Sequence, residues 1–210
     1  MKPIWLASYP RSGNTLVRTI LYQCFNLKTG SIYVNDLGGK SPLENYVGHI
    51  EHNENQSITF PPGSLPIIKT HKFQNGDNST IYVVRDGRAA CASLWEFTNP
   101  KVSMIDIIEG NHRFGKWCDH VESWSPLSRP NTLLLRYEDI LEDLNKTLYK
   151  LSNFLEREIT HNMLPSRDMI ADKDGKWVRK KTDWQNILSD KELESFYRVN
   201  SKHMQLFGYK

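Results

Sequence analysis

The sequence has few cysteines and no long hydrophobic run. Its three cysteines, Cys24, Cys91 and Cys118, are far apart, odd in number and without the spacing of a metal-binding motif. We therefore expect reduced thiols in or near the core. No stretch approaches the roughly 18 apolar residues that span a bilayer, and the first residues lack the long apolar segment of a signal peptide. We expect a cytoplasmic protein with no membrane partner.

A large excess of charge of one sign is also missing. The formal net charge is +3 over 210 residues, which by itself does not indicate a nucleic-acid partner. Internal repeats, low-complexity tracts and linkers are absent too. The hydrophobic content of 39% and the length indicate a globular chain with a core. We expect one domain, residues 1–210.

What the sequence does contain is an alternation of short apolar segments with segments of helical period. The expected strands cover residues 4–7, 67–69, 81–84 and 133–135. The expected helices cover residues 15–25, 87–97, 105–124 with interruptions near Gly110 and Gly115, 144–155 and 191–207. The stretches 26–65 and 156–189 are expected to be mostly loop. Such alternation predicts an α/β domain with a central parallel sheet flanked by helices.

The segment SYPRSGNT, residues 8–15, lies between the first expected strand and helix. It follows the phosphate-loop template G-x-x-x-x-G-K-[ST] at Gly13 and Thr15, but Asn14 occupies the lysine position. Backbone N–H groups at the start of the helix favour an anion, and Arg11 supplies a cation. The missing lysine argues against ordinary ATP hydrolysis, as does the strand 81–84, which runs into Arg85 instead of a magnesium-binding acid.

Several further segments occur in a defined order along the chain. They are IIKTHK at 67–72, YVVRDGRAACASLW at 82–95, LLLRYEDILEDL at 133–144, VRKKTDW at 178–184 and LFGY at 206–209. Together with YPRSGNT they resemble the sulfotransferases that use 3′-phosphoadenosine 5′-phosphosulfate (PAPS) as donor. The resemblance spans the whole chain and implies a P-loop fold related to the nucleotide kinases, with no metal requirement.

The resemblance implies two anion sites for the donor. The residues implied for the 5′-phosphosulfate are Arg11, Ser12, Gly13, Asn14 and Thr15, and those for the 3′-phosphate are Arg85, Ser93, Arg179 and Lys180. A guanidinium suits the second site because it can grip phosphate with two hydrogen bonds. Tyr137 is implied near adenine, with a core position as the alternative. The chain departs from the family pattern after Lys180, where the loop is shorter and lacks a glycine, and at Leu16, where the family often has tryptophan.

Lys69 and His71 are the acid–base candidates. They are two residues apart at the end of an expected strand, so both side chains are expected on one side. We expect His71 to be the general base that takes the proton from an acceptor hydroxyl. Lys69 and Arg11 would neutralise charge on the transferring group during direct in-line transfer.

Two other functions are weighed against sulfuryl transfer. One is a P-loop kinase or NTPase, and the other is a non-catalytic nucleotide-binding relative. The sequence favours a small hydroxylated acceptor, with an amine, a glycan or a peptide as alternatives, and leaves the oligomeric state open. The loops 28–65 and 95–125 are expected to form the acceptor pocket. Five aromatic residues could line it or could equally lie in the core: Tyr33, Tyr46, Phe60, Trp95 and Phe97.

Overall fold

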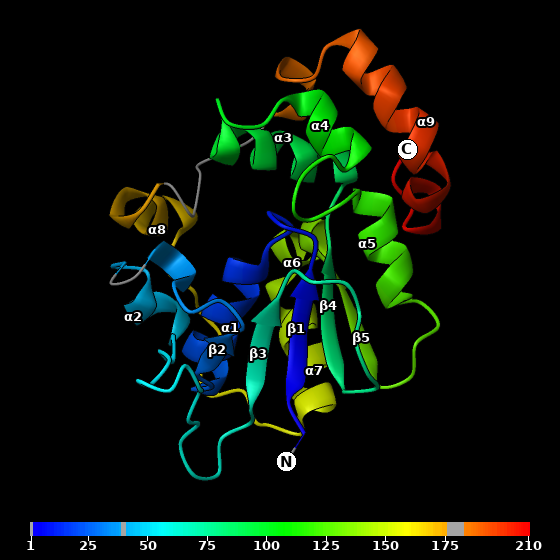
Figure 1. Ribbon diagram of the computed structural model, residues 1–210. Helices are drawn as coiled ribbons and strands as arrows, with labels where there is room; N and C mark the ends of the chain where they lie inside the picture. The colour runs from blue at the N-terminus through cyan, green and yellow to red at the C-terminus, as the bar shows by residue number, and fades with distance from the viewer. Residues whose placement is uncertain (1, 39–40, 176–182) are drawn as a thin grey trace.

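A parallel sheet forms the centre of the protein. The computed structural model describes residues 2–38, 41–175 and 183–210, and within them five strands pair in the order β2-β3-β1-β4-β5 (Figure 1). The strands are β1 (Ile4–Ser8), β2 (Thr29–Ser31), β3 (Ile67–Thr70), β4 (Thr80–Val84) and β5 (Thr132–Arg136). All four pairings are parallel, which confirms the predicted central parallel sheet.

Residues along the strands alternate between two apolar cores. In β4, Ile81 and Val83 pack into one cluster, whereas Tyr82 and Val84 pack into the other. All of them are almost completely buried. Burial on both faces is typical of parallel sheets and explains the continuous apolar sequence of this strand.

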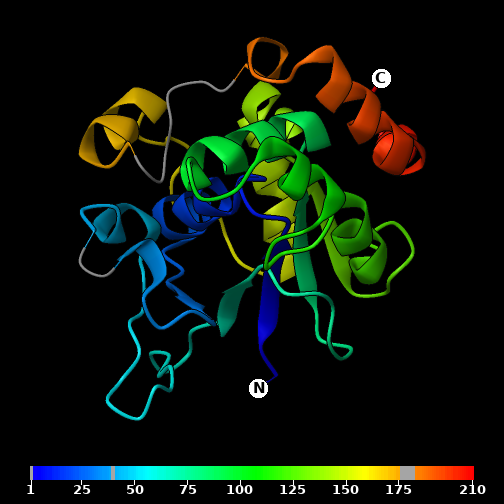
Figure 2. The same ribbon diagram turned by 45° about the horizontal axis from the view of Figure 1, so that its top comes forward.

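Helices cover both faces of the sheet (Figures 1 and 2). Helices α1 (Asn14–Phe25), α6 (Tyr137–Glu142) and α7 (Leu144–Leu155) contribute to the core that contains Ile81. Helices α3 (Gly87–Thr98), α4 (Met104–Glu109), α5 (Trp117–Trp124) and α9 (Asp190–Leu206) contribute to the core that contains Tyr82. The expected helix 105–124 is therefore two helices, with Gly110 and Gly115 between them as predicted.

The two stretches expected to be mostly loop contain more regular structure than predicted. Residues 26–65 include β2, the 3-10 helix η1 (Asp36–Gly38) and α2 (Glu44–Val47). Residues 156–189 include α8 (Arg167–Lys173) and the 3-10 helix η2 (Trp184–Asn186). These elements are too short to show a clear period, and tertiary contacts stabilise them instead: Ile170 of α8 packs against Leu37 and the residues around α2.

Cys24, Cys91 and Cys118 are free and buried, as expected. Within the described ranges, no helix is both long and apolar enough to cross a membrane.

The strand order places the functional loops together. After β1 the chain adds β2 and β3 on one side of it, then β4 and β5 on the other. The loops that follow β1, β3, β4 and β5 all leave the same edge of the sheet because the strands are parallel. In open α/β sheets, ligands bind at this carboxyl edge, where the strand order reverses.

Candidate active site

A cavity of about 560 Å³ lies at the carboxyl edge of the sheet. Its wall includes nine of the predicted site residues: Arg11, Gly13, Asn14, Thr15, Lys69, His71, Arg85, Ser93 and Tyr137. Ser12 is completely buried behind the wall. Arg179 and Lys180 lie outside the described residues. The structure thus brings together most of a site that the sequence distributes over more than 120 positions.

The loop between β1 and α1 is shaped by Gly13. This residue has a φ of 105°, in the region that favours glycine, and it precedes the first residue of α1. A Cβ at Gly13 would lie 2.5 Å from Cδ2 of Tyr137, so the tyrosine ring packs directly on the loop backbone. No side chain caps the start of α1, and Gly13, Asn14 and Thr15 line the cavity, so the positive end of the helix lies at this wall.

Asn14 binds the protein's own backbone. Its Nδ2 donates to the Leu6 carbonyl oxygen at 3.1 Å and to Ser8 Oγ at 3.4 Å. The amide therefore ties the start of α1 to β1, and it fills the position at which a phosphate loop would have a mobile lysine.

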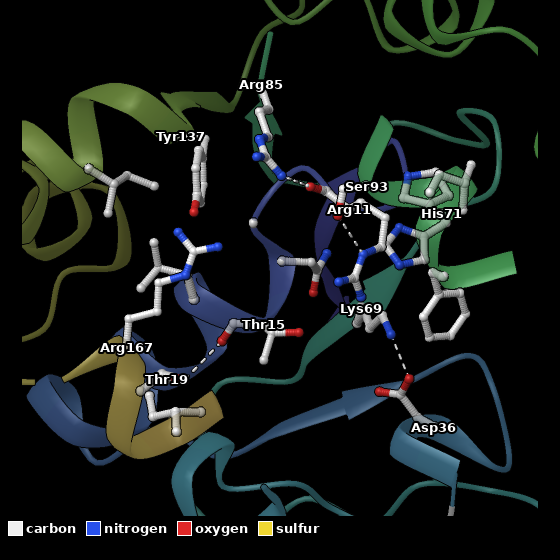
Figure 3. Close-up of a pocket in the computed structure, with 18 of the residues that line it drawn as sticks. Arg11, Thr15, Thr19, Asp36, Lys69, His71, Arg85, Ser93, Tyr137 and Arg167 are labelled. Carbon is white, nitrogen blue, oxygen red and sulfur yellow. Dashed lines mark hydrogen bonds and ion pairs between the residues drawn. The ribbon is translucent and has the colours of Figure 1, made fainter. Parts of the chain in front are cut away.

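Arg11, Arg85 and Ser93 form one contiguous group (Figure 3). Arg11 Nε donates to Ser93 Oγ at 3.1 Å, and Arg85 Nη1 donates to the Arg11 carbonyl oxygen at 2.9 Å. Because Ser93 accepts the Arg11 hydrogen bond, its own hydroxyl hydrogen can be donated to a ligand. The two predicted anion sites therefore adjoin, with Arg11 between them.

A buried carboxylate fixes Lys69. Asp36 Oδ1 lies 2.5 Å from Lys69 Nζ, and Asp36 Oδ2 lies 2.5 Å from Arg18 Nη1. Burial alone would raise the pKa of Asp36, but the charges of Lys69 and Arg18 hold it well below its usual range. Burial also lowers the pKa of Lys69, against the attraction of Asp36. Asp36 therefore stays ionised and holds the ammonium group of Lys69 in the cavity wall.

His71 is the first residue after β3. Its Nδ1 lies 2.8 Å from the Ser8 carbonyl oxygen, which can only accept, so Nδ1 carries the hydrogen. Burial and the charge of Lys69 lower the pKa of His71 well below 6.5. The ring is therefore neutral near pH 7, with the Nε2 lone pair available. The rings of Tyr33 and Phe114 flank it, each with a centroid 6.0 Å from that of His71.

Three charged residues of the cavity wall were not predicted from the sequence: Asp36, Arg113 and Arg167. Asp36 lies in a stretch without a recognisable motif. One signal could have revealed it, because Arg18 stands between apolar residues on the buried face of its helix and requires a buried acid as partner.

The expected acceptor aromatics divide between wall and core. Tyr33 and Phe97 line the cavity, and Arg11 lies over the Phe97 ring at 5.1 Å. Tyr46 and Trp95 pack against the hydrophobic clusters instead, and Phe60 lies beside Gly30. Among the described residues, no three His, Cys, Asp or Glu side chains are grouped as metal ligands.

The chain is similar to known proteins over nearly its full length. Residues 1–198 match the family model of the sulfotransferase domain. Human sulfotransferase 2B1 is 25% identical in an alignment that covers 96% of this chain and 66% of the relative. Human sulfotransferase 1E1 is 29% identical in an alignment that covers 79% of this chain and 60% of the relative. The chain thus spans no more than about two thirds of the length of these relatives.

Solved structures share the fold at low sequence identity. Retinol dehydratase in complex with androsterone and the inactive cofactor PAP has a TM-score of 0.68, with 17% identity over 97% of this chain and 80% of its own. Mouse sulfotransferase SULT7A1 complexed with PAP has a TM-score of 0.65 and 19% sequence identity, and the match covers 97% of this chain and 84% of the mouse chain. With the family model covering residues 1–198, the chain belongs to the sulfotransferase domain family.

Proposed function

We propose that this protein transfers a sulfuryl group from PAPS to a hydroxyl group of a small acceptor. The main support for this proposal is the position of His71. Its imidazole is neutral, is fixed through Nδ1, and lies in the wall of a cavity that Arg11 and Lys69 also line. A positioned base next to cations is the arrangement that proton removal and charge neutralisation require.

The charge of the cavity fits a polyanionic donor. Of the described residues in its wall, Arg11, Lys69, Arg85, Arg113 and Arg167 are basic, and only Asp36 is acidic. Arg11, the backbone N–H groups of the β1–α1 loop, including that of Asn14, and the side chain of Thr15 would bind the 5′-phosphosulfate. Arg85 and Ser93, with Arg179 and Lys180, would bind the 3′-phosphate, and Tyr137 would lie near adenine.

The proposed reaction is a single displacement. His71 Nε2 accepts the proton of the acceptor hydroxyl as the acceptor oxygen forms a bond to sulfur. The bond between sulfur and the bridging oxygen of the donor breaks, and adenosine 3′,5′-bisphosphate leaves with the electron pair. Lys69 and Arg11 offset the negative charge that develops on the bridging and sulfuryl oxygens.

The aromatic residues around His71 support a small acceptor with an apolar ring. Tyr33 and Phe114 flank His71, and Phe97 also lines the cavity. Aromatic walls are typical of small-molecule sites. Retinol dehydratase, which shares the fold, has been solved with retinol and with androsterone.

The buried free thiols support the prediction of a reducing, cytoplasmic environment.

Phosphoryl transfer from ATP has less support. Asn14 stands at the lysine position and donates its amide hydrogens to the protein, and Arg85 follows β4 where an acid would be needed for magnesium. A non-catalytic role has less support because it leaves the fixed base His71 unexplained.

Thermal unfolding tests the proposed donor. At about 100 times its Kd, adenosine 3′,5′-bisphosphate without magnesium should raise the free energy of unfolding by about 2.7 kcal/mol. Mg-ATP at the same concentration should have a much smaller effect. The reverse ranking would refute the proposed donor. Labelled PAPS, offered with a panel of phenols, alcohols and amines, then identifies the acceptor.

A further inference from the structure

Arg167 points into the cavity from the side opposite Arg85. It is the first residue of α8, whose start is capped by Ser166 Oγ accepting from the Met169 N–H at 3.2 Å. Figure 3 shows its guanidinium beside Tyr137, directed toward the space into which Arg85 also points. Segments far apart in the sequence thus place two guanidinium groups around one end of the cavity.

The wall that carries Arg167 is held on the body of the protein. Ile170, in the middle of α8, is buried against Leu37, Leu43 and Val47. At the end of the helix, Ser41 Oγ donates to Asp174 Oδ2 at 2.6 Å. These contacts fix the position of α8 and therefore the approach of Arg167 to the cavity.

The two guanidinium groups repel each other in the absence of a ligand. Burial lowers the pKa of Arg85, and the charge of Arg167 lowers it further, while Tyr137 and Glu138 act in the opposite direction. Glu138 accepts hydrogen bonds from the Asp86 N–H at 3.0 Å and the Tyr209 hydroxyl at 2.7 Å. An anion between Arg85 and Arg167 would offset this repulsion.

We propose that Arg167 is a further donor-binding residue, which holds the 3′-phosphate of the nucleotide from the side opposite Arg85. This inference rests on the proposed function and adds a residue to it. The phosphate would then accept hydrogen bonds from two guanidinium groups and from the Ser93 hydroxyl, and Arg is the side chain best suited to such planar, paired contacts.

A different role for Arg167 would be to stack on the adenine base. Leu16, Leu144 and Leu164 also line the cavity and could hold an apolar ring. The two roles differ in one respect: a phosphate contact requires the 3′-phosphate, whereas stacking does not. Comparing adenosine 3′,5′-bisphosphate with adenosine 5′-monophosphate therefore separates them.

Calorimetric titration of the full chain at fixed ionic strength provides the test. Arg167→Gln should weaken binding of adenosine 3′,5′-bisphosphate by about 10-fold to 100-fold, the range expected for lost hydrogen bonds to a charged group. Its affinity for adenosine 5′-monophosphate should stay within about 2-fold of the wild-type value. The matched control is Arg157→Gln, an exposed arginine after α7 outside the cavity wall, which should change neither affinity.

The outcomes distinguish the two proposals. Equal losses of affinity for the two nucleotides in Arg167→Gln would indicate stacking and overturn the phosphate role. Unchanged affinities for both nucleotides would also overturn it. A wild-type protein that does not prefer the bisphosphate overturns the proposed donor and this inference together. If Arg167→Gln unfolds without ligand, Arg167→Lys replaces it. That variant keeps the charge but not the paired contacts, and it should lose part of the preference for the bisphosphate; full retention would contradict the inference.

Discussion

The Ser8 carbonyl oxygen determines which nitrogen of His71 can act as base. His71→Asn keeps an N–H donor for this carbonyl but has no group that accepts a proton near neutral pH. We expect sulfuryl transfer to fall by about 10² to 10⁴-fold, the usual contribution of general-base catalysis, with the affinity for adenosine 3′,5′-bisphosphate nearly unchanged. Steady-state rates and calorimetry on the same preparation measure both. His161→Asn, at an exposed position, is the control. An unchanged rate in His71→Asn would remove His71 from the mechanism.

Asp36 is the acid on which two buried cations depend. Arg18 is 0% exposed and Lys69 is 6% exposed, so Asp36→Asn would remove the carboxylate that both buried cations contact. We expect the free energy of unfolding to fall by about 3 to 5 kcal/mol, the usual cost of removing one partner of a buried ion pair. Urea denaturation measures it. Asp77→Asn, at an exposed site, should cost almost nothing, and similar losses in both variants would contradict the assigned role of Asp36.

At the scale of elements, the β1–α1 loop depends on close contact between Gly13 and Tyr137. Gly13→Ala should cost about 1 to 2 kcal/mol for its backbone conformation and about 1 to 3 kcal/mol more for the collision with the Tyr137 ring. It should also weaken nucleotide binding. Gly63→Ala is the matched control, because Gly63 has a φ of 75° but no atom within 4 Å of the added Cβ. Chemical denaturation of both variants separates strain from collision. Equal losses would mean that the Tyr137 contact is unimportant.

Elements with a clear period or a run of β-branched residues could be predicted from the sequence. The predicted and observed bounds agree within one residue for β1, β3, β4, β5, α1, α3, α7 and α9. By contrast, β2 is three residues long and pairs only at the edge of the sheet. Helix α8 depends on the burial of Ile170 against distant residues. Tertiary contacts of this kind leave no local pattern.

The same distinction applies to the site. Residues in motifs, such as His71 and Arg85, could be predicted because their spacing from a strand end indicates where they lie. Asp36 and Arg167 could not, since they reach the cavity from η1 and α8, which no local pattern predicts. The predicted phosphate contact of Asn14 stays a prediction, although its amide nitrogen already donates to the protein.

The whole molecule should lose stability in mild acid. Burial lowers the pKa of His49 to about 4 and that of His120 to about 3, and it lowers the pKa of His71 as well. Below pH 6.5 the unfolded chain binds protons at these positions and the folded protein does not. Their contribution is therefore fully present above pH 6.5 and is lost as the pH falls toward their folded pKa values. His120, which is completely buried, should contribute a slope of up to about 1.4 kcal/mol per pH unit.

Urea unfolding at pH 7.5, 6.5, 5.5 and 4.5 measures this dependence. His120→Gln keeps a polar partner for the Tyr82 hydroxyl, which lies 2.9 Å from His120 Nδ1, but it cannot bind the proton. It should therefore reduce the slope below pH 6.5. A free energy of unfolding that is constant from pH 7.5 to 4.5 would contradict the neutral state of these buried histidines.

The central position of β1 has a consequence for the synthesis of the chain. This strand is made before both of its neighbours, β3 and β4, and β4 ends at Val84. At 5 to 20 residues per second, β1 waits about 4 to 15 s on the ribosome before both partners exist. During that time its apolar residues, among them Leu6 and Ala7, have no sheet in which to bury. The strand that carries the β1–α1 loop can therefore complete its pairing only after residue 84 has been made.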